Sequence, residues 1–253
     1  MKNKLEVKNI SKRFFGKNKD ELVISDISFQ VKEGEFLVIL GPGRSGKTVL
    51  LDIIAGLLPK SSGEVLLDNE IIEGINPKIS MVFQQTAIMP FKTVMDNVTI
   101  GLKFKGMNKK DRNVIAQKYI DLVGLQGFEK SFPYQLSGGM KQRVGIARAY
   151  ANNPEVLLMD EPFGQLDAQT RYSMQEEVIR ISTADNETKT IIFVTNNIEE
   201  ACILGDRIVL LSSSPSEVQD VYNLNDIPKP RDPLDRRFLE VRENISNNMD
   251  LVV

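Results

Sequence analysis

The sequence predicts an α/β protein with a parallel sheet core, an N-terminal antiparallel β subdomain and an inserted helical subdomain. Short apolar runs alternate with segments of helical periodicity, which is typical of a parallel sheet whose strands are joined by helices. A glycine-rich octapeptide at 41–48 directly follows the apolar run 36–40. Between residues 93 and 150 the periodicity is helical throughout, which indicates an insertion into the sheet.

The expected elements follow from these periodicities in chain order. Strands are expected at 5–14, 24–32, 35–40, 64–67, 79–83, 156–159, 190–194 and 207–211. Helices are expected at 49–57, 93–103, 109–123, after 137–139, and at 168–182, 198–204 and 234–247. A charged turn at 17–20 joins the first two strands, which favours an antiparallel pair.

We expect a single domain over residues 1–253. Within it, 1–85 and 156–212 form the core with the β subdomain, 86–155 form the helical subdomain, and 213–253 form a C-terminal extension. Prolines punctuate this extension before its final helix. We expect the extension to be a packing strap, the alternative being a regulatory segment.

Composition excludes several classes of protein. The net charge of −2 provides no broad basic surface, so no nucleic-acid partner is expected. A single cysteine and the absence of histidine exclude a disulfide framework and a cysteine-based zinc site. No segment approaches the ~20 apolar residues that span a bilayer, so we expect any membrane association to come from a partner.

The octapeptide has the spacing G-x-x-x-x-G-K-[ST] of a loop that wraps backbone N–H groups around a polyphosphate. The Lys47 ammonium is expected to reach the β- and γ-phosphates of a nucleoside triphosphate, and the Thr48 hydroxyl to coordinate Mg²⁺. A plain glycine turn is the alternative. The residues expected to bind the nucleotide here are Gly41, Pro42, Gly43, Arg44, Ser45, Gly46, Lys47, Thr48 and Val49.

A second motif ends the apolar run 156–159 with two acidic residues. Asp160 is expected to hold Mg²⁺, and Glu161 to activate the attacking water as general base. Acidic residues are common at strand ends, so this pattern gains its weight from the phosphate loop that accompanies it.

A third motif, the signature segment at 136–143, reads Leu-Ser-Gly-Gly-Met-Lys-Gln-Arg. Ser137, Gly138 and Gly139 lie at an expected helix N-terminus, where backbone N–H groups bind anions; a simple serine cap is the alternative. With this segment, nearly the whole chain resembles the ATP-binding cassette (ABC) ATPases. The resemblance implies a RecA-like P-loop core and a head-to-tail homodimer in which the signature residues bind the γ-phosphate of ATP held by the opposite chain.

The same resemblance implies further site residues. Phe14, or else Phe15, matches the aromatic residue that stacks on adenine, and Gln84 matches the glutamine that contacts Mg²⁺ and the attacking water. Asp167 matches a residue that bridges to the partner subunit. The alternatives are a core phenylalanine, an ordinary surface glutamine and a helix cap.

Within the family, segments 84–98, 204–212 and 228–232 are similar to importers of the nitrate, sulfonate and taurine group. This similarity implies transmembrane permease subunits as direct partners, a solute-binding protein as an indirect one, and a peripheral location on the cytoplasmic face of the membrane. An ATPase of a different ABC transporter class is the alternative.

Asn196 stands where most of the family has a histidine that contacts the γ-phosphate. Its amide still donates a hydrogen bond but carries no positive charge. We therefore expect either slow hydrolysis, or that Asn196 keeps the hydrogen bond and catalysis depends on Glu161. A nucleotide-binding regulatory module is the alternative. Arg44 is a second departure, because the family usually has glycine there.

Overall fold

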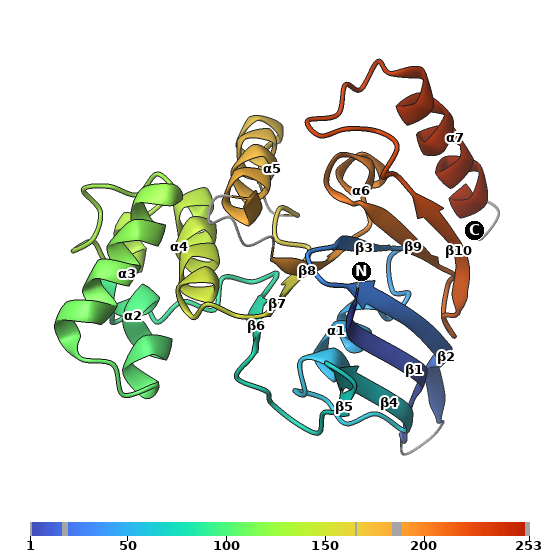
Figure 1. Cartoon of the computed structure of the whole chain (residues 1–253), viewed down its shortest axis with the longest axis horizontal. Coiled ribbons are helices and arrows are strands. Elements are labelled where there is room, and N and C mark those ends of the chain that lie inside the picture. Colours follow the sequence, from blue (N-terminus) through green and yellow to red (C-terminus); the bar gives the residue numbers. More distant parts are fainter. Residues whose placement is uncertain (1, 17–19, 165, 184–188, 251–253) are drawn as a thin grey trace. The chain divides into compact units, whose positions relative to one another are not determined.

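The computed structural model describes residues 2–16, 20–164, 166–183 and 189–250, and it has the expected mixture of sheets and helices (Figure 1). Most of the turn expected at 17–20 lies outside these residues. The chain divides into two compact units. Unit 1 comprises Met1–Asn76 and Thr188–Val253, and unit 2 comprises Pro77–Glu187.

Unit 1 contains an antiparallel sheet with the strand order β2-β1-β4-β5. Its strands are β1 (Asn3–Phe14), β2 (Glu21–Lys32), β4 (Ser62–Leu67) and β5 (Glu70–Ile71). Along much of β2, buried residues alternate with exposed or half-buried ones, because successive side chains of a strand point to opposite faces of its sheet. β1 and β2 pair antiparallel, as predicted for the first two strands.

The second group of strands in unit 1 carries the phosphate loop. β3 (Phe36–Leu40) lies between β8 (Thr190–Thr195) and β9 (Arg207–Leu211) and is parallel to both. All residues of β3 and β8 are buried, as expected for parallel strands covered on both faces. The helices of this unit are α1 (Lys47–Ile54), α6 (Ile198–Leu204) and α7 (Arg236–Asp250). Helix α6 packs on β3, and α7 packs on α6 (Figure 1).

Unit 2 combines a parallel strand pair with helices. β6 (Ile79–Val82) pairs with β7 (Val156–Asp160). Between them in sequence come α2 (Val94–Phe104), α3 (Lys109–Leu122), the short 3₁₀ helix η1 (Pro133–Gln135) and α4 (Gly138–Ala151). Helices α2, α3 and α4 pack on one another (Figure 1), and α5 (Ala168–Thr183) follows β7.

Polar side chains define where these helices begin. Thr93, Asn108, Ser137 and Asn197 each precede a helix, and each accepts a hydrogen bond from the backbone N–H three residues later. Such caps satisfy donors that have no partner inside the helix. The start of α4, and with it the signature segment, is therefore set by a local interaction.

Several elements differ from the sequence expectation, which did not include the short β5 and η1. Helix α1 ends at Ile54 rather than at 57, because Gly56 has φ +74°, which a helix cannot contain. A Cβ at this position would lie 1.9 Å from the Gly74 carbonyl oxygen, so only glycine fits. The sequence also missed β10 (Val218–Asn223), which pairs antiparallel with β9. Its side chains are largely exposed, so its sequence has too little apolar alternation to indicate a strand.

Candidate active site

The phosphate loop joins β3 to α1, and its lysine is buried within it. Lys47 is 4% exposed, and its Nζ donates to the carbonyl oxygens of Gly41 (3.0 Å) and Pro42 (2.8 Å) and lies 3.3 Å from Ser45 Oγ. Gly46 caps α1 in the left-handed conformation, with φ 77°, and has no side chain to bond the first-turn N–H groups. The loop thus combines a positive charge with backbone donors, the combination that binds phosphate.

Glycine is required at some positions of this loop and tolerated at others. A Cβ on Gly46 would lie 2.9 Å from Val23 Cγ1, and its φ also disfavours other residues. Gly43 has no atom near the position of a Cβ. Arg44, however, has φ 65°, so it occupies the left-handed region without being glycine. The backbone therefore gives a physical reason for the glycine that the resemblance places at position 44.

The acidic pair lies at the end of β7, whose five residues are all buried. Asp160 is the last residue of the strand and is 4% exposed. Glu161 follows with φ 37°, which turns the chain sharply after the strand. Gln84 Nε2 donates to Glu161 Oε2 at 3.3 Å. Unit 2 therefore brings together two residues that lie 77 positions apart in the sequence and that were both expected to act on the water.

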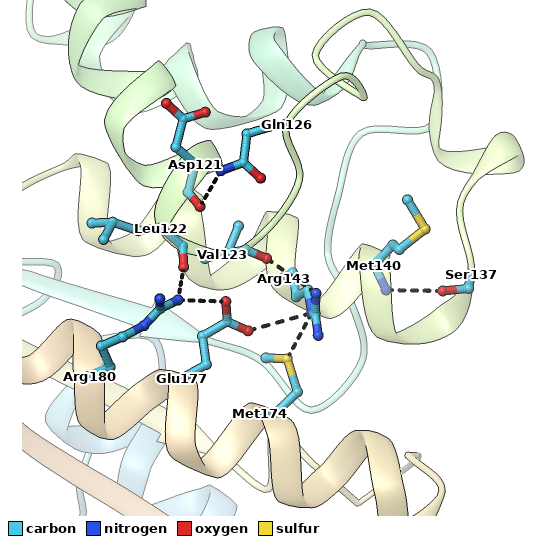
Figure 2. Close-up of polar contacts among 10 residues, drawn as sticks. All are labelled: Asp121, Leu122, Val123, Gln126, Ser137, Met140, Arg143, Met174, Glu177 and Arg180. Atoms are coloured by element: carbon cyan, nitrogen blue, oxygen red, sulfur yellow. Dashed lines mark hydrogen bonds and ion pairs between the residues drawn. The ribbon is translucent and has the colours of Figure 1, made fainter.

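Ser137 directly precedes α4 (Figure 2), and it is exposed, as is Gly138, the first residue of the helix, whereas Gly139 is half-buried. Ser137 Oγ accepts a hydrogen bond from Met140 N at 3.3 Å, so the serine is the cap of this helix. A capping hydroxyl keeps its own proton for donation to an anion. The structural role therefore coexists with the phosphate role expected for Ser137.

Asp167 is likewise a helix cap, directly before α5. Its carboxylate accepts from Thr170 N at 3.0 Å and from Thr170 Oγ1 at 2.7 Å. These hydrogen bonds hold the pKa of Asp167 below its ordinary value. The helix-cap alternative is observed, and the bridging role stays a prediction.

The two remaining expected residues are exposed in unit 1. Phe14 ends β1, is 39% exposed, and has Lys12 Nζ 4.8 Å from its ring centroid; Phe15 is 79% exposed. Asn196 directly follows β8 and is exposed. The next residue, Asn197, is fixed as the cap of α6.

Comparison with known proteins decides the family. A family model described as ABC transporter matches residues 24–164, which is more than half of the chain. The chain belongs to the ABC transporter family. This cassette is therefore an ATP-binding ATPase. No helix among its described residues is long and apolar enough to cross a membrane.

Named relatives extend over most of the cassette. An uncharacterized ABC transporter ATP-binding protein of Methanocaldococcus jannaschii is 47% identical, covering 98% of this chain and 91% of the relative. A taurine import ATP-binding protein of Rhizobium johnstonii is 43% identical over 87% of this chain and 86% of its own length. An aliphatic sulfonates import ATP-binding protein of Bacillus cereus is 39% identical, with coverages of 95% and 94%.

Solved structures confirm the predicted fold class. The dimeric structure of a bacterial ABC transporter cassette matches with a TM-score of 0.78 and 34% identity, covering 87% of this chain and 98% of that one. A second dimeric structure of that cassette, in a post-hydrolysis state bound to ADP and Pi, matches with the same TM-score at 33% identity.

The expected site residues of the cassette are divided between its two units. Unit 1 contains Phe14, the phosphate loop with Val49, and Asn196. Unit 2 contains Gln84, the signature residues, Asp160, Glu161 and Asp167. Sequence analysis missed Thr170, although a Thr three residues after an Asp is a recognisable capping pattern. It also assigned no role to Arg143 of α4 or to Glu177 and Arg180 of α5, for which the sequence contains no local signal.

Proposed function

We propose that this cassette hydrolyses ATP to power the import of small anionic solutes, among which sulfonates such as taurine have the most support. The names of the relatives from Rhizobium and Bacillus, a taurine and an aliphatic sulfonates import protein, support this solute class. Nitrate belongs to the same group by resemblance. The solute would contact a binding protein and the permease rather than the cassette.

The observation that carries the enzymatic part is the hydrogen bond from Gln84 to Glu161. It orients the Glu161 carboxylate, the group proposed to take a proton from the attacking water. The donors of the phosphate loop and Lys47 would hold the β- and γ-phosphates of ATP. Asn196 would add one neutral hydrogen bond to the γ-phosphate, and Phe14 would stack on adenine.

Mg²⁺ fits the oxygen donors that the cassette offers. The described residues contain no group of three acidic, cysteine or histidine side chains that could form a protein cage. Mg²⁺ typically takes one or two protein ligands and completes its shell with phosphates and water. Thr48, Asp160 and Gln84 are the proposed ligands, direct or through water, and the ion would neutralise charge on the phosphate oxygens.

The proposed working form is a head-to-tail pair of cassettes bound to two permease subunits on the cytoplasmic face of the membrane. The dimeric cassette structures support the pairing. In such a pair, Ser137, Gly138 and Gly139 would bind the γ-phosphate of ATP held by the other chain, and Asp167 would contact that chain.

Uptake measurements in the source organism test this proposal. Deleting the gene should abolish energy-dependent uptake of labelled taurine or alkanesulfonates, and expressing the unmodified cassette should restore it. Glu161→Gln should fail to restore uptake, because loss of the general base slows turnover by about 10²–10⁴-fold. The purified variant should still bind ATP.

Unchanged uptake of every anion offered would contradict the proposed solutes. ATP turnover that survives Glu161→Gln would contradict the proposed catalytic role. The regulatory alternative predicts neither effect, and the Gln84–Glu161 contact argues against it because a vestigial site has no use for an oriented carboxylate.

A further inference from the structure

Helix α5 carries a nearly buried carboxylate between two arginines of unit 2 (Figure 2). Glu177 Oε2 lies 3.5 Å from Arg143 Nε on α4, and Glu177 Oε1 lies 3.4 Å from Arg180 Nη2. The glutamate side chain is 8% exposed, Arg143 is 24% exposed and Arg180 is 62% exposed. Burial raises the pKa of Glu177, and both arginines oppose this rise.

Both arginines also bind the carboxyl end of α3. Arg143 Nη1 donates to the Val123 carbonyl oxygen at 3.4 Å, and Arg180 Nη2 donates to that of Leu122 at 2.6 Å. These carbonyls belong to the helix end, where they lack intrahelical partners and favour positive charge. Arg143 Nε also lies 3.2 Å from Met174 Sδ on α5. A single side chain of α4 therefore contacts both α3 and α5.

A second contact between α4 and α5 lies one turn closer to the signature serine. A Cβ added to Gly139 would lie 3.0 Å from Thr170 Cγ2, so the first turn of α4 packs tightly on α5. Thr170 is the same residue that bonds the Asp167 carboxylate. The helix start at Ser137 and the cap at Asp167 are thus linked through one threonine.

We propose that Arg143 and Glu177 are positioning residues that hold the signature end of α4 in a fixed orientation on α5. The pair acts through Ser137, which it does not touch. With the Gly139–Thr170 contact, it makes the signature turn and the Asp167 cap a single rigid body. Its catalytic consequence rests on the proposed role of Ser137 in binding the γ-phosphate held by the other chain.

The chemistry of the pair explains why Arg143 matters more than Arg180. Removing Arg143 leaves a nearly buried carboxylate whose one remaining ion pair, among the residues that the structure describes, is with Arg180. Arg180 is mostly in water, and solvent weakens its attraction. It also removes the link from α4 to the end of α3. Removing Arg180 leaves the contact between α4 and α5 intact, so Arg180→Ala is a matched control.

The test compares Arg143→Ala with Arg180→Ala in the purified cassette. Arg143→Ala should lower kcat at saturating ATP by about tenfold to a hundredfold, the scale expected when a catalytic constellation is misplaced. The affinity for ATP should be unchanged, because the phosphate loop belongs to unit 1. Arg180→Ala should leave kcat within about twofold of the unmodified cassette.

Amide hydrogen exchange supplies a second readout that does not need turnover. The amides of residues 140–142, the first ones at this helix start with acceptors, should lose protection in Arg143→Ala and keep it in Arg180→Ala. Arg143→Lys keeps the charge but not the forked geometry, so it should restore part of kcat and of the protection.

Equal effects of the two alanine variants on kcat and on exchange would overturn the proposal, as would an unchanged kcat in Arg143→Ala. If the unmodified cassette has no turnover, the proposed ATPase function fails, and the exchange comparison still decides whether Arg143 positions α4.

Discussion

Helices α1 and α4 each begin at a turn expected to bind phosphate, but the two turns are built differently. The turn before α1 is capped by Gly46, with no side-chain bond, and encloses the nearly buried Lys47 ammonium. The turn before α4 is exposed at Ser137 and Gly138, encloses no buried lysine and is capped by the Ser137 hydroxyl. The first turn therefore has both its positive charge and the backbone conformation that shapes it within one short segment.

This difference indicates that the two turns have different roles in binding ATP. A loop with a buried cation can bind the polyphosphate of the ATP held by the same chain without support from neighbouring helices. A turn that offers only a hydroxyl and the partial charge of a helix end binds weakly and must be held at the correct place. The polar contacts around Arg143 provide that support.

The largest expected effect comes from removing the cation of the first turn. Lys47→Ala should lower ATP turnover by about 10²–10³-fold, because the charge that meets the developing phosphate charge is lost. ATP affinity, measured by calorimetry, should fall as well. Unchanged affinity and turnover would show that the first turn does not depend on its lysine.

The second turn should respond to charge and not to size. Gly138 has no atom near the position of a Cβ, so neither Gly138→Ala nor Gly138→Asp should disturb the fold of the chain. Gly138→Asp places a carboxylate where the partner's phosphate is expected and should lower turnover by more than about tenfold. Gly138→Ala is the uncharged control and should retain most of the activity. Equal losses in both variants would indicate a steric effect instead.

A substitution at Asn196 tests the first turn further, with a smaller expected change in turnover. It is exposed after β8, and Asn196→His would add a side chain that can carry charge near the phosphate held by the first turn. Because the Asn196 amide is itself expected to donate a hydrogen bond to the phosphate, turnover should rise by about tenfold at most. Asn196→Gln controls for length. Unchanged turnover in Asn196→His would contradict the hypothesis that the asparagine slows hydrolysis.

The smallest expected effect concerns the backbone of the first turn. Arg44 has φ 65°, a conformation that costs a non-glycine residue about 1–2 kcal/mol. Glycine also makes the unfolded chain more flexible, which offsets about 0.4–1 kcal/mol of this gain, so Arg44→Gly should raise the Tm by about 2–4 °C in thermal denaturation. Gly43→Ala is the matched control, since Gly43 has no positive φ and open space around it. A lower Tm for Arg44→Gly would show that the arginine has stabilising contacts.

The sequence predicted the parts of the site that depend on local rules. The phosphate loop follows from glycine spacing, and Asp160 with Glu161 follows from a buried strand that ends in acids. The cap at Ser137 and the start of α4 were also predictable, because a serine before two glycines is a local signal.

Other parts depend on pairs that lie far apart in sequence. Glu177 lies 34 positions after Arg143, and each residue by itself resembles an ordinary charged residue on a helix surface. The close approach of Gly139 to Thr170 needs the packing of two helices before it can be seen. β10 escaped detection for another reason, since an edge strand held by main-chain bonds does not need apolar residues.

Mixing two inactive variants tests the central claim most directly, namely that the two turns act on one ATP from opposite chains. In Lys47→Ala the first turn is defective, and in Gly138→Asp the second turn is defective, so each variant should be nearly inactive alone. Mixed pairs contain one site with both turns intact. Random pairing should therefore restore up to about a quarter of the unmodified turnover, since half of the pairs are mixed and each has one working site. No recovery on mixing, with mixed pairs demonstrated in the sample, would contradict the account.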